Sequence, residues 1–255
     1  MPTFSIITAT YNAEKFMARA MASIMGQTYG SFEWIIQDGG STDATVAIVQ
    51  RSSDKRIKLV SEPDTGVYDA WNKAVARASG GWYIFLGGDD CLLTKDTLLQ
   101  CAEHLAAMPE HVEFAYGALV VGTKGDNMML MNNSVFGAYH GFLANMGIPF
   151  PATFIRGSLL QKERFDTKYK IAGDYEFAAR LVTRKNLARI PRIVSYMERG
   201  GLSGNPRDER LLNERLRILH TAILPRSAEF VHGEMLYLKH PEAVLQMPKD
   251  GERLF

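Results

Sequence analysis

The chain has 255 residues, of which 46% are hydrophobic and 22% charged, and its formal net charge is +1. This length and composition predict a globular protein with a sizeable core, and the near-zero charge gives no electrostatic case for nucleic acid. No signal-peptide pattern, no apolar run of roughly 20 residues and no metal-ligand cysteine spacing is visible, so we expect a soluble, cytoplasmic protein.

Strands and helices alternate over the first 108 residues. Strands are expected at 4–8, 32–37, 57–61 and 83–86, and helices at 13–26, 43–51 and 67–78, where Asn12 is expected to cap the first helix. This alternation predicts an α/β fold whose mostly parallel sheet has helices on both faces. The crossovers should be right-handed.

The pattern changes after residue 109. Strands are expected at 114–121, 152–156, 188–191 and 193–197, with a hairpin or loop at 122–133. A helix is expected from Gly173 to about residue 184 and a charged amphipathic helix at 207–224. We therefore expect a smaller mixed region after the parallel sheet, followed by a C-terminal helix.

Two adjacent carboxylates, Asp89 and Asp90, follow Gly87 and Gly88 at the end of strand 83–86. Carboxylates this close repel each other unless a cation lies between them or each finds hydrogen-bond donors. Hard oxygen ligands suit Mg²⁺ or Mn²⁺, which usually bind together with a substrate phosphate. The alternative interpretation is an ordinary polar turn.

Polar residues also follow the first two strands. Thr10, Tyr11 and Asn12 follow the first, and Asp38 ends the second. In a doubly wound sheet these strand ends share one edge with Asp89 and Asp90, where ligands bind. This edge has the character of a nucleotide site, but it lacks the glycine patterns of dinucleotide-binding and P-loop proteins.

Four segments occur in this order: residues 5–12 (SIITATYN), 37–43 (QDGGSTD), 61–73 (SEPDTGVYDAWNK) and 86–90 (LGGDD). Together they resemble the family 2 glycosyltransferases, inverting nucleotide-sugar enzymes with the Rossmann-like GT-A fold. They are most similar to members that build bacterial capsule, O-antigen or exopolysaccharide repeat units. The resemblance covers residues 4–91 strongly and residues 150 to about 204 moderately, and it is absent from the tail.

The resemblance implies a role for each matching position. The donor-binding positions are Thr10, Tyr11 and Asn12 around the nucleoside, Asp38 on the base (usually uracil), Asp69 and Lys73 near ribose and diphosphate, and Asp89 on the ribose. Asp90 matches the metal ligand, for Mn²⁺ or Mg²⁺. Two positions depart from the family: Gly39 replaces a common second acid, and Phe150-Pro151 stand where relatives often carry His-Gln.

Asp174 matches the position of the catalytic base, at the start of a helix. Inversion is a direct displacement, so the acceptor hydroxyl must lose its proton opposite the departing diphosphate. Glu176 is the alternative, and a helix N-cap is the non-catalytic interpretation of Asp174. The implied organisation is a nucleotide-sugar-binding half (1–108), an acceptor and catalytic-base half (109–204) and a C-terminal helical extension (205–255).

The implied partners are a nucleotide-diphospho-sugar donor, UDP-linked, and a saccharide or lipid-linked acceptor. Helix 207–224 could therefore contact the inner face of the bacterial inner membrane peripherally, or it could pack on its own core or on a second subunit of a homodimer. Two other functions stay open: a sugar-1-phosphate nucleotidyltransferase and a non-catalytic sugar-nucleotide-binding protein.

Overall fold

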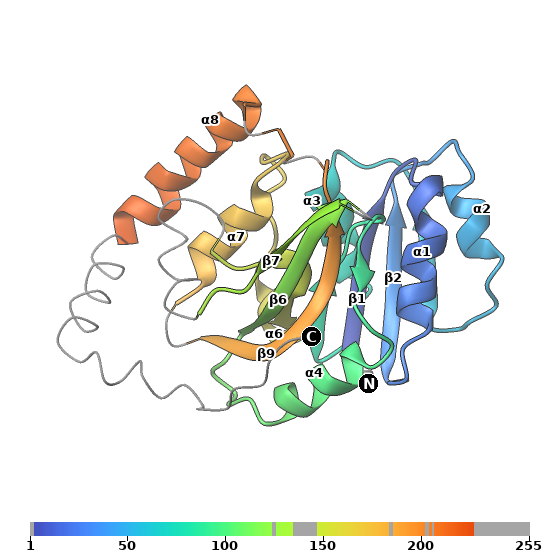
Figure 1. Cartoon of the computed structure of the whole chain (residues 1–255). Helices are drawn as coiled ribbons and strands as arrows, with labels where there is room; N and C mark the ends of the chain where they lie inside the picture. The colour runs from blue at the N-terminus through green and yellow to red at the C-terminus, as the bar shows by residue number, and fades with distance from the viewer. Residues whose placement is uncertain are drawn as a thin grey trace.

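The computed structural model describes residues 3–123, 126–134, 147–183, 186–201, 204–205 and 207–226. They form one mixed sheet in the order β3-β2-β1-β4-β8-β6-β9-β5, with β7 paired to β6 (Figure 1). The strands are β1 (Phe4–Thr10), β2 (Phe32–Asp38), β3 (Ile57–Ser61), β4 (Trp82–Phe85), β5 (Cys91–Leu92), β6 (Phe114–Thr123), β7 (Asp126–Met131), β8 (Thr153–Arg156) and β9 (Leu187–Glu198). The α-helices are α1 (Glu14–Met25), α2 (Thr45–Gln50), α3 (Val67–Val75), α4 (Thr97–Ala106), α6 (Gly157–Lys162), α7 (Gly173–Leu181) and α8 (Glu209–Ile218).

The first half of the sheet is parallel, as the sequence predicts. β1 pairs in parallel with β2 and β4, and β2 pairs in parallel with β3. In this register Thr10 lies opposite Asp38, and Asp38 lies opposite Ser61. The carboxyl ends of these strands therefore meet at one edge of the sheet.

Helices cover both faces of this sheet, because successive residues along its strands are apolar and their side chains point to opposite faces. Ile6 and Ile84 lie in a hydrophobic cluster that includes residues of α1, α2 and α4. Ile7 and Phe85 lie in a second cluster, with residues of α3, α7 and α8. Figure 1 shows α7 and α8 on the left of the molecule, away from α1 and α2 on the right. The predicted α/β fold class is confirmed.

The second half of the sheet is mixed. β8 is antiparallel to β4 and β6, β7 forms a hairpin with β6, and β9 runs parallel to β6. The two strands expected at 188–191 and 193–197 are one continuous strand, β9. Pro191 lies where the β6–β9 register shifts beside Gly117, so its missing N–H does not break an ordered ladder. A Cβ on Gly117 would lie 2.5 Å from Val194 Cγ2, so only glycine fits there.

Other predicted elements differ at their ends. The two-residue strand β5 and the short helix α6 carry too little pattern to be expected from sequence. The expected helix at 207–224 is α8 followed by a π-helical turn, Leu219–Ile223, and a 3-10 turn, Leu224–Arg226. Residues 227–255 of the expected C-terminal extension lie outside the described residues. Within the described ranges, no helix is long and apolar enough to span a bilayer.

Candidate active site

Asp89 and Asp90 converge on one backbone position after β4. Gly87 N donates to Asp90 Oδ2 at 2.7 Å. A Cβ on Gly87 would lie 2.6 Å from Asp89 Oδ1 and 3.2 Å from Asp90 Oδ2, so both carboxylates lie close to this glycine. Burial raises the pKa of Asp90 to about 7, with a further contribution from the charge of Asp89. Burial also raises the pKa of Asp89.

The raised pKa values mean that nearby positive charge does not offset the burial of these two carboxylates. A divalent cation would relieve both the burial and the mutual repulsion, and carboxylate oxygens suit Mg²⁺ and Mn²⁺. Among the described residues, no three His, Cys, Asp or Glu side chains gather into a metal site. The acidic pair therefore fits a cation whose remaining ligands come from phosphate and water rather than from a protein cage.

Arg19 of α1 holds the backbone of this turn. Its guanidinium donates to Asp89 O at 2.7 Å and pairs with Glu198 Oε2 of β9 at 2.8 Å. It also lies over the Tyr196 ring, 5.5 Å from the ring centroid. This contact could not be predicted from sequence, because 70 residues separate Arg19 from Asp89.

Asp38 lies at the expected edge but is fully buried. Asp38 Oδ2 accepts hydrogen bonds from Gly40 N (3.1 Å), Ser41 N (2.9 Å) and Ser61 Oγ (2.6 Å), and Oδ1 accepts one from Ser41 Oγ (2.5 Å). The carboxylate thus anchors the turn after β2. A direct contact with a base would require Ser41 to move.

The segment after β1 presents an aromatic ring. Tyr11 is 63% exposed, and a Cβ on Gly39 would lie 3.5 Å from its ring and 2.6 Å from Asp64 Oδ2. Tyr11 and Asp64 therefore lie close against Gly39 beside the sheet edge. Asp64 stands inside a recognised segment, but sequence reasoning gave it no role.

Thr10 and Asn12 flank Tyr11 with different environments. Thr10 Oγ1 is buried and has no hydrogen-bond partner among the described residues, and it would lie 3.0 Å from a Cβ on Gly88. Asn12 has a positive φ of 50°, and its Oδ1 accepts from Thr42 N at 2.9 Å. The expectation that Asn12 caps α1 is wrong, because its side chain ties two loops together instead.

Asp69 and Lys73 brace the loop before α3. Asp69 Oδ2 accepts from Thr65 N at 2.9 Å, and Lys73 Nζ donates to Pro63 O at 2.9 Å. Lys73 Nζ also lies 3.5 Å from Asp69 Oδ2, in an ion pair one helical turn apart. Both side chains hold the loop at the start of α3.

Asp174 lies in the first turn of α7, and the N-cap is Ala172, so Asp174 is not the helix cap. Its Oδ1 accepts from the Tyr68 hydroxyl of α3 at 3.0 Å and from Tyr175 N at 2.9 Å. Burial is the largest influence on this carboxyl and raises its pKa to about 6. Oδ2 has no hydrogen-bond partner among the described residues, so one oxygen is available to a substrate.

Contacts from α3 position this segment beside the sheet edge. The Tyr68 hydroxyl also donates to Ile171 O at 2.7 Å, and a Cβ on Gly173 would lie 2.8 Å from the Tyr68 ring. Lys170 Nζ donates to Thr65 O at 2.9 Å, in the loop after β3. Tyr68 was not singled out from sequence, although it stands in the third recognised segment.

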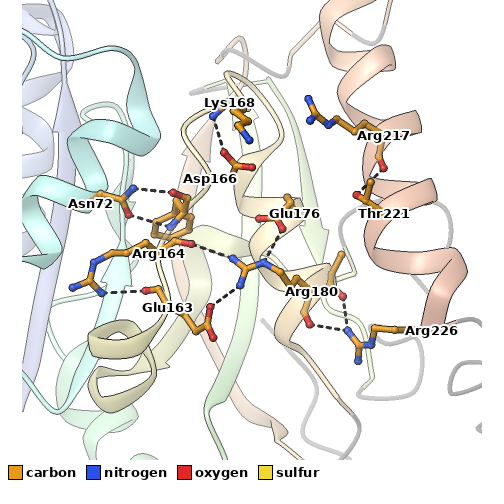
Figure 2. Close-up of polar contacts among 12 residues, drawn as sticks. Asn72, Glu163, Arg164, Asp166, Lys168, Glu176, Arg180, Arg217, Thr221 and Arg226 are labelled. Atoms are coloured by element: carbon orange, nitrogen blue, oxygen red, sulfur yellow. Dashed lines mark hydrogen bonds and ion pairs between the residues drawn. The ribbon is translucent and has the colours of Figure 1, made fainter.

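Glu176, the alternative base, is committed to an ion pair. Arg180 Nε donates to Glu176 Oε1 at 2.7 Å, and Arg180 Nη1 donates to Glu163 Oε2 at 2.7 Å. Figure 2 shows Arg180 between these two carboxylates. Glu176 Oε2 is buried and has no hydrogen-bond partner among the described residues, but Arg180 compensates the charge of Glu176, whereas Asp174 has a raised pKa. Asp174 is therefore the better placed of the two to accept a proton.

Phe150 and Pro151 belong to a 3-10 turn before β8. Phe150 is buried and stacks on Trp71, with ring centroids 5.6 Å apart and planes 13° apart. Its side chain is thus part of the core and presents no polar group to an acceptor.

Known proteins resemble this chain in sequence and in fold. The family model described as glycosyl transferase family 2 matches residues 5–185. A PGL/p-HBAD biosynthesis glycosyltransferase of Mycobacterium bovis is 33% identical over 83% of this chain and 83% of its own length. The Escherichia coli UDP-Glc:alpha-D-GlcNAc-diphosphoundecaprenol beta-1,3-glucosyltransferase WfgD is 29% identical over 73% of this chain and 72% of its own.

Two solved structures share the fold. Staphylococcus aureus TarS 1–349 in complex with UDP superposes with a TM-score of 0.69 at 21% identity, covering 98% of this chain and 73% of that one. Glucosyl-3-phosphoglycerate synthase from Mycobacterium tuberculosis, in complex with Mn²⁺, UDP and glucosyl-3-phosphoglycerate, gives a TM-score of 0.58 at 18% identity over 88% of this chain and 80% of that one.

Proposed function

The chain belongs to glycosyl transferase family 2 and is a glycosyltransferase, and from this premise we propose the reaction that it catalyses. It moves a hexosyl group from a UDP-linked nucleotide-diphospho-sugar to a saccharide or lipid-linked saccharide, with inversion at the anomeric carbon. The donor and the acceptor are supported by WfgD, whose name gives UDP-Glc and a diphosphoundecaprenol-linked sugar. The product would enter a bacterial surface polysaccharide or glycolipid.

The environment of Asp174 carries the proposal. Its carboxyl has a pKa raised to about 6, so it is ionised at neutral pH yet basic enough to take a proton. The Tyr68 hydroxyl has one hydrogen but faces two acceptors, Asp174 Oδ1 and Ile171 O. The hydrogen bond from Tyr68 favours the ionised form of Asp174 and lowers its pKa, and the larger effect of burial raises it.

In the proposed step Asp174 removes the proton of the acceptor hydroxyl. The hydroxyl oxygen forms a bond to the anomeric carbon while the bond from that carbon to the diphosphate oxygen breaks. The electron pair of the broken bond leaves with the nucleoside diphosphate, and the proton stays on Asp174. No covalent enzyme intermediate is needed, so the anomeric configuration inverts.

The acidic pair fits the divalent cation that this leaving group requires. Asp90 would be the ligand, with Asp89 next to it toward the ribose, and a bound Mn²⁺ or Mg²⁺ would neutralise charge on the departing diphosphate. The support is the convergence of both carboxylates on Gly87 with raised pKa values. Arg19 keeps the backbone of Asp89 in place.

The donor nucleoside would lie over the edge formed by the ends of β1 and β2. Tyr11 has an exposed ring on which a base could stack, and Thr10 and Asn12 flank it. Asp38 would shape the turn from within and would reach the base only after Ser41 moves. Asp69 and Lys73 would act on ribose and diphosphate through the loop that they hold.

We assign residues 1–108 to donor binding, 109–204 to the acceptor and the base, and 205–255 to a C-terminal extension. Peripheral membrane contact would involve α8, whose Leu211 and Ile218 pack in the core while Leu212 and Leu216 are 44% and 55% exposed. The exposed Arg210 lies on the same helix. This surface could equally receive a second copy of the chain.

A donor panel tests the proposed function. UDP-glucose, UDP-N-acetylglucosamine and GDP-mannose are incubated with the protein and Mn²⁺, and nucleoside diphosphate release is measured with and without a diphosphoundecaprenol-linked sugar. We expect acceptor-stimulated release from a UDP-sugar and a product of inverted configuration. Binding without release would indicate a non-catalytic protein, pyrophosphate formation from UTP and a sugar 1-phosphate would indicate a nucleotidyltransferase, and a retained configuration would remove Asp174 as base.

A further inference from the structure

The segment from α8 to Arg226 contacts both ends of α7, the helix that carries Asp174. At the N-terminal end, the Glu214 carboxylate accepts three backbone N–H groups in a row. Lys170 N donates to Oε1 at 2.6 Å, and Ile171 N and Ala172 N donate to Oε2 at 3.0 and 2.7 Å. These amides include the N-cap of α7 and end two residues before Asp174.

At the C-terminal end, Arg226 binds the carbonyl groups that α7 leaves unpaired. Its Nη1 donates to Ala179 O at 2.6 Å and Arg180 O at 3.0 Å, and its Nη2 donates to Val182 O at 2.8 Å (Figure 2). An acid therefore binds the positive end of the helix dipole, and an arginine binds its negative end. Both residues lie beyond residue 185, where the match to the family model ends.

We propose that this C-terminal segment is a positioning element for the proposed catalytic base, in which Glu214 and Arg226 together fix α7 against the donor-binding half. We call Glu214 and Arg226 the clamp, and Glu214→Gln and Arg226→Gln the clamp variants. The inference rests on the proposed role of Asp174. Neither residue touches the substrate, so each acts through the helix. With α7 held in place, the Tyr68 hydroxyl of α3 can donate its hydrogen bond to Asp174.

Glu214 also has an electrostatic effect on the base. Its negative charge raises the pKa of Asp174, in addition to the larger effect of burial. The groups that face this segment are the Tyr68 hydroxyl from α3, Tyr175 and Glu176 on α7, Lys170 in the preceding loop, and Glu214 and Arg215 from α8. A neutral residue at position 214 should therefore lower the pKa of Asp174, which a purely structural contact would not do.

The test compares Glu214→Gln and Arg226→Gln with two controls on α8, Glu209→Gln and Arg210→Gln, in the full chain. Glu209 and Arg210 are exposed, and replacing them changes the charge in the same way at positions that do not contact α7. UDP release from UDP-glucose or UDP-N-acetylglucosamine in Mn²⁺ is measured from pH 4.5 to 8, together with UDP affinity and the melting temperature. Asp174→Asn is the reference for loss of the base.

We expect both clamp variants to lower kcat about tenfold to a hundredfold, since a small misplacement of a catalytic group has effects of this size. UDP affinity should stay within about twofold, because the clamp lies on the acceptor side, and Glu214→Gln should move the acid limb of the pH profile to lower pH. The controls should behave as wild type. If Glu214→Gln alters stability, the pH shift at temperatures well below its melting point still separates positioning from folding.

Three results would overturn the inference. The first is wild-type kcat and pH profile in both clamp variants while Asp174→Asn is inactive, which leaves the proposed function intact. The second is a loss of activity that only parallels a loss of folded protein, with an unmoved acid limb. The third is an active Asp174→Asn enzyme, which removes the base and this inference together.

Discussion

The turns after β2 and β4 both place acidic residues beside two glycines at the carboxyl edge of the sheet, but their carboxylates have different environments. Asp38 is fully buried and accepts four hydrogen bonds from its own turn and from Ser61. Asp90 is almost as buried, accepts one from Gly87, and faces the charge of Asp89. Hydrogen bonds thus satisfy the carboxylate of Asp38, whereas among the described residues Asp90 accepts a single hydrogen bond and lies beside a like charge.

The difference suggests that Asp38 stabilises the fold, whereas Asp90 serves ligand binding, although both lie at the same edge of the sheet. A carboxylate that the protein satisfies stabilises the structure, and its loss should first reduce stability. Two carboxylates that repel each other in a buried place cost stability, so their loss should first reduce ligand binding and activity. The following experiments test the comparison, beginning with the largest expected effect.

Asp90→Ala should reduce transfer by roughly a thousandfold or more, because a metal ion contributes several kcal/mol to stabilising a departing phosphate. The variant should also lose the Mn²⁺-dependent part of UDP binding, measured by titration calorimetry with and without EDTA. Its melting temperature without metal should not fall. Wild-type turnover in this variant, or turnover that EDTA leaves unchanged, would contradict the metal assignment.

Asp174→Asn should lower kcat about 10² to 10⁴-fold, the usual effect of removing a general base. UDP and Mn²⁺ should bind as in wild type, because Asp174 stands in α7 rather than at the edge of Asp89 and Asp90. Glu176→Gln is the matched control, since Glu176 is already paired with Arg180. Activity of Asp174→Asn within a few-fold of wild type would show that another group takes the proton.

At saturating Mn²⁺, which would keep Asp90 ionised, the pH profile of kcat/KM should fall below about pH 6, by about tenfold per pH unit, because only ionised Asp174 accepts a proton. The hydrogen bond from Tyr68 lowers the pKa of Asp174, so Tyr68→Phe should raise that pKa and move the acid limb to higher pH. This shift is opposite in sign to the one expected for Glu214→Gln. Assays across pH 4.5 to 8 in buffers of constant ionic strength measure both, and an unmoved limb in Tyr68→Phe would count against the contact.

Asp38→Asn should lower the free energy of unfolding by about 1–3 kcal/mol, because an amide NH₂ would face backbone donors in a buried turn. Asp90→Asn makes the same chemical change in the other turn and removes a buried repulsion, so its unfolding free energy without metal should not fall by more than about 1 kcal/mol. Urea unfolding of both variants gives the comparison directly. Equal destabilisation would mean that the two turns do not differ as described.

The smallest effect concerns α8. Replacing the exposed Leu212 and Leu216 with glutamine should reduce sedimentation with vesicles of anionic lipid several-fold and should leave the melting temperature nearly unchanged. Leu99→Gln on α4, also exposed, is the control. No lipid-dependent sedimentation of wild type, together with a dimer in light scattering, would assign this surface to a second subunit.

The sequence predicted the donor side of the molecule well. The strands β1 to β4 were predicted as short strand segments and the helix α3 from its apolar stripe, and parallel pairing then placed Thr10, Asp38 and the Asp89-Asp90 turn on one edge. Sequence could not show that Asp38 is satisfied by Ser61, since 23 residues separate them. Arg19, Glu214 and Arg226 were missed for the same reason: ordinary charged helix residues gain their meaning only from contacts made far along the chain.

β9 connects the two proposed chemical centres within one strand. It begins at Leu187, six residues after α7 ends at Leu181, and it ends at Glu198, which pairs with Arg19 and through it holds the backbone of Asp89. Inserting or deleting one residue in β9 would turn every later side chain to the opposite face and would take Glu198 away from Arg19. During evolution of this lineage, changes of length should therefore accumulate in the connections around β9, while the strand itself keeps a constant number of residues.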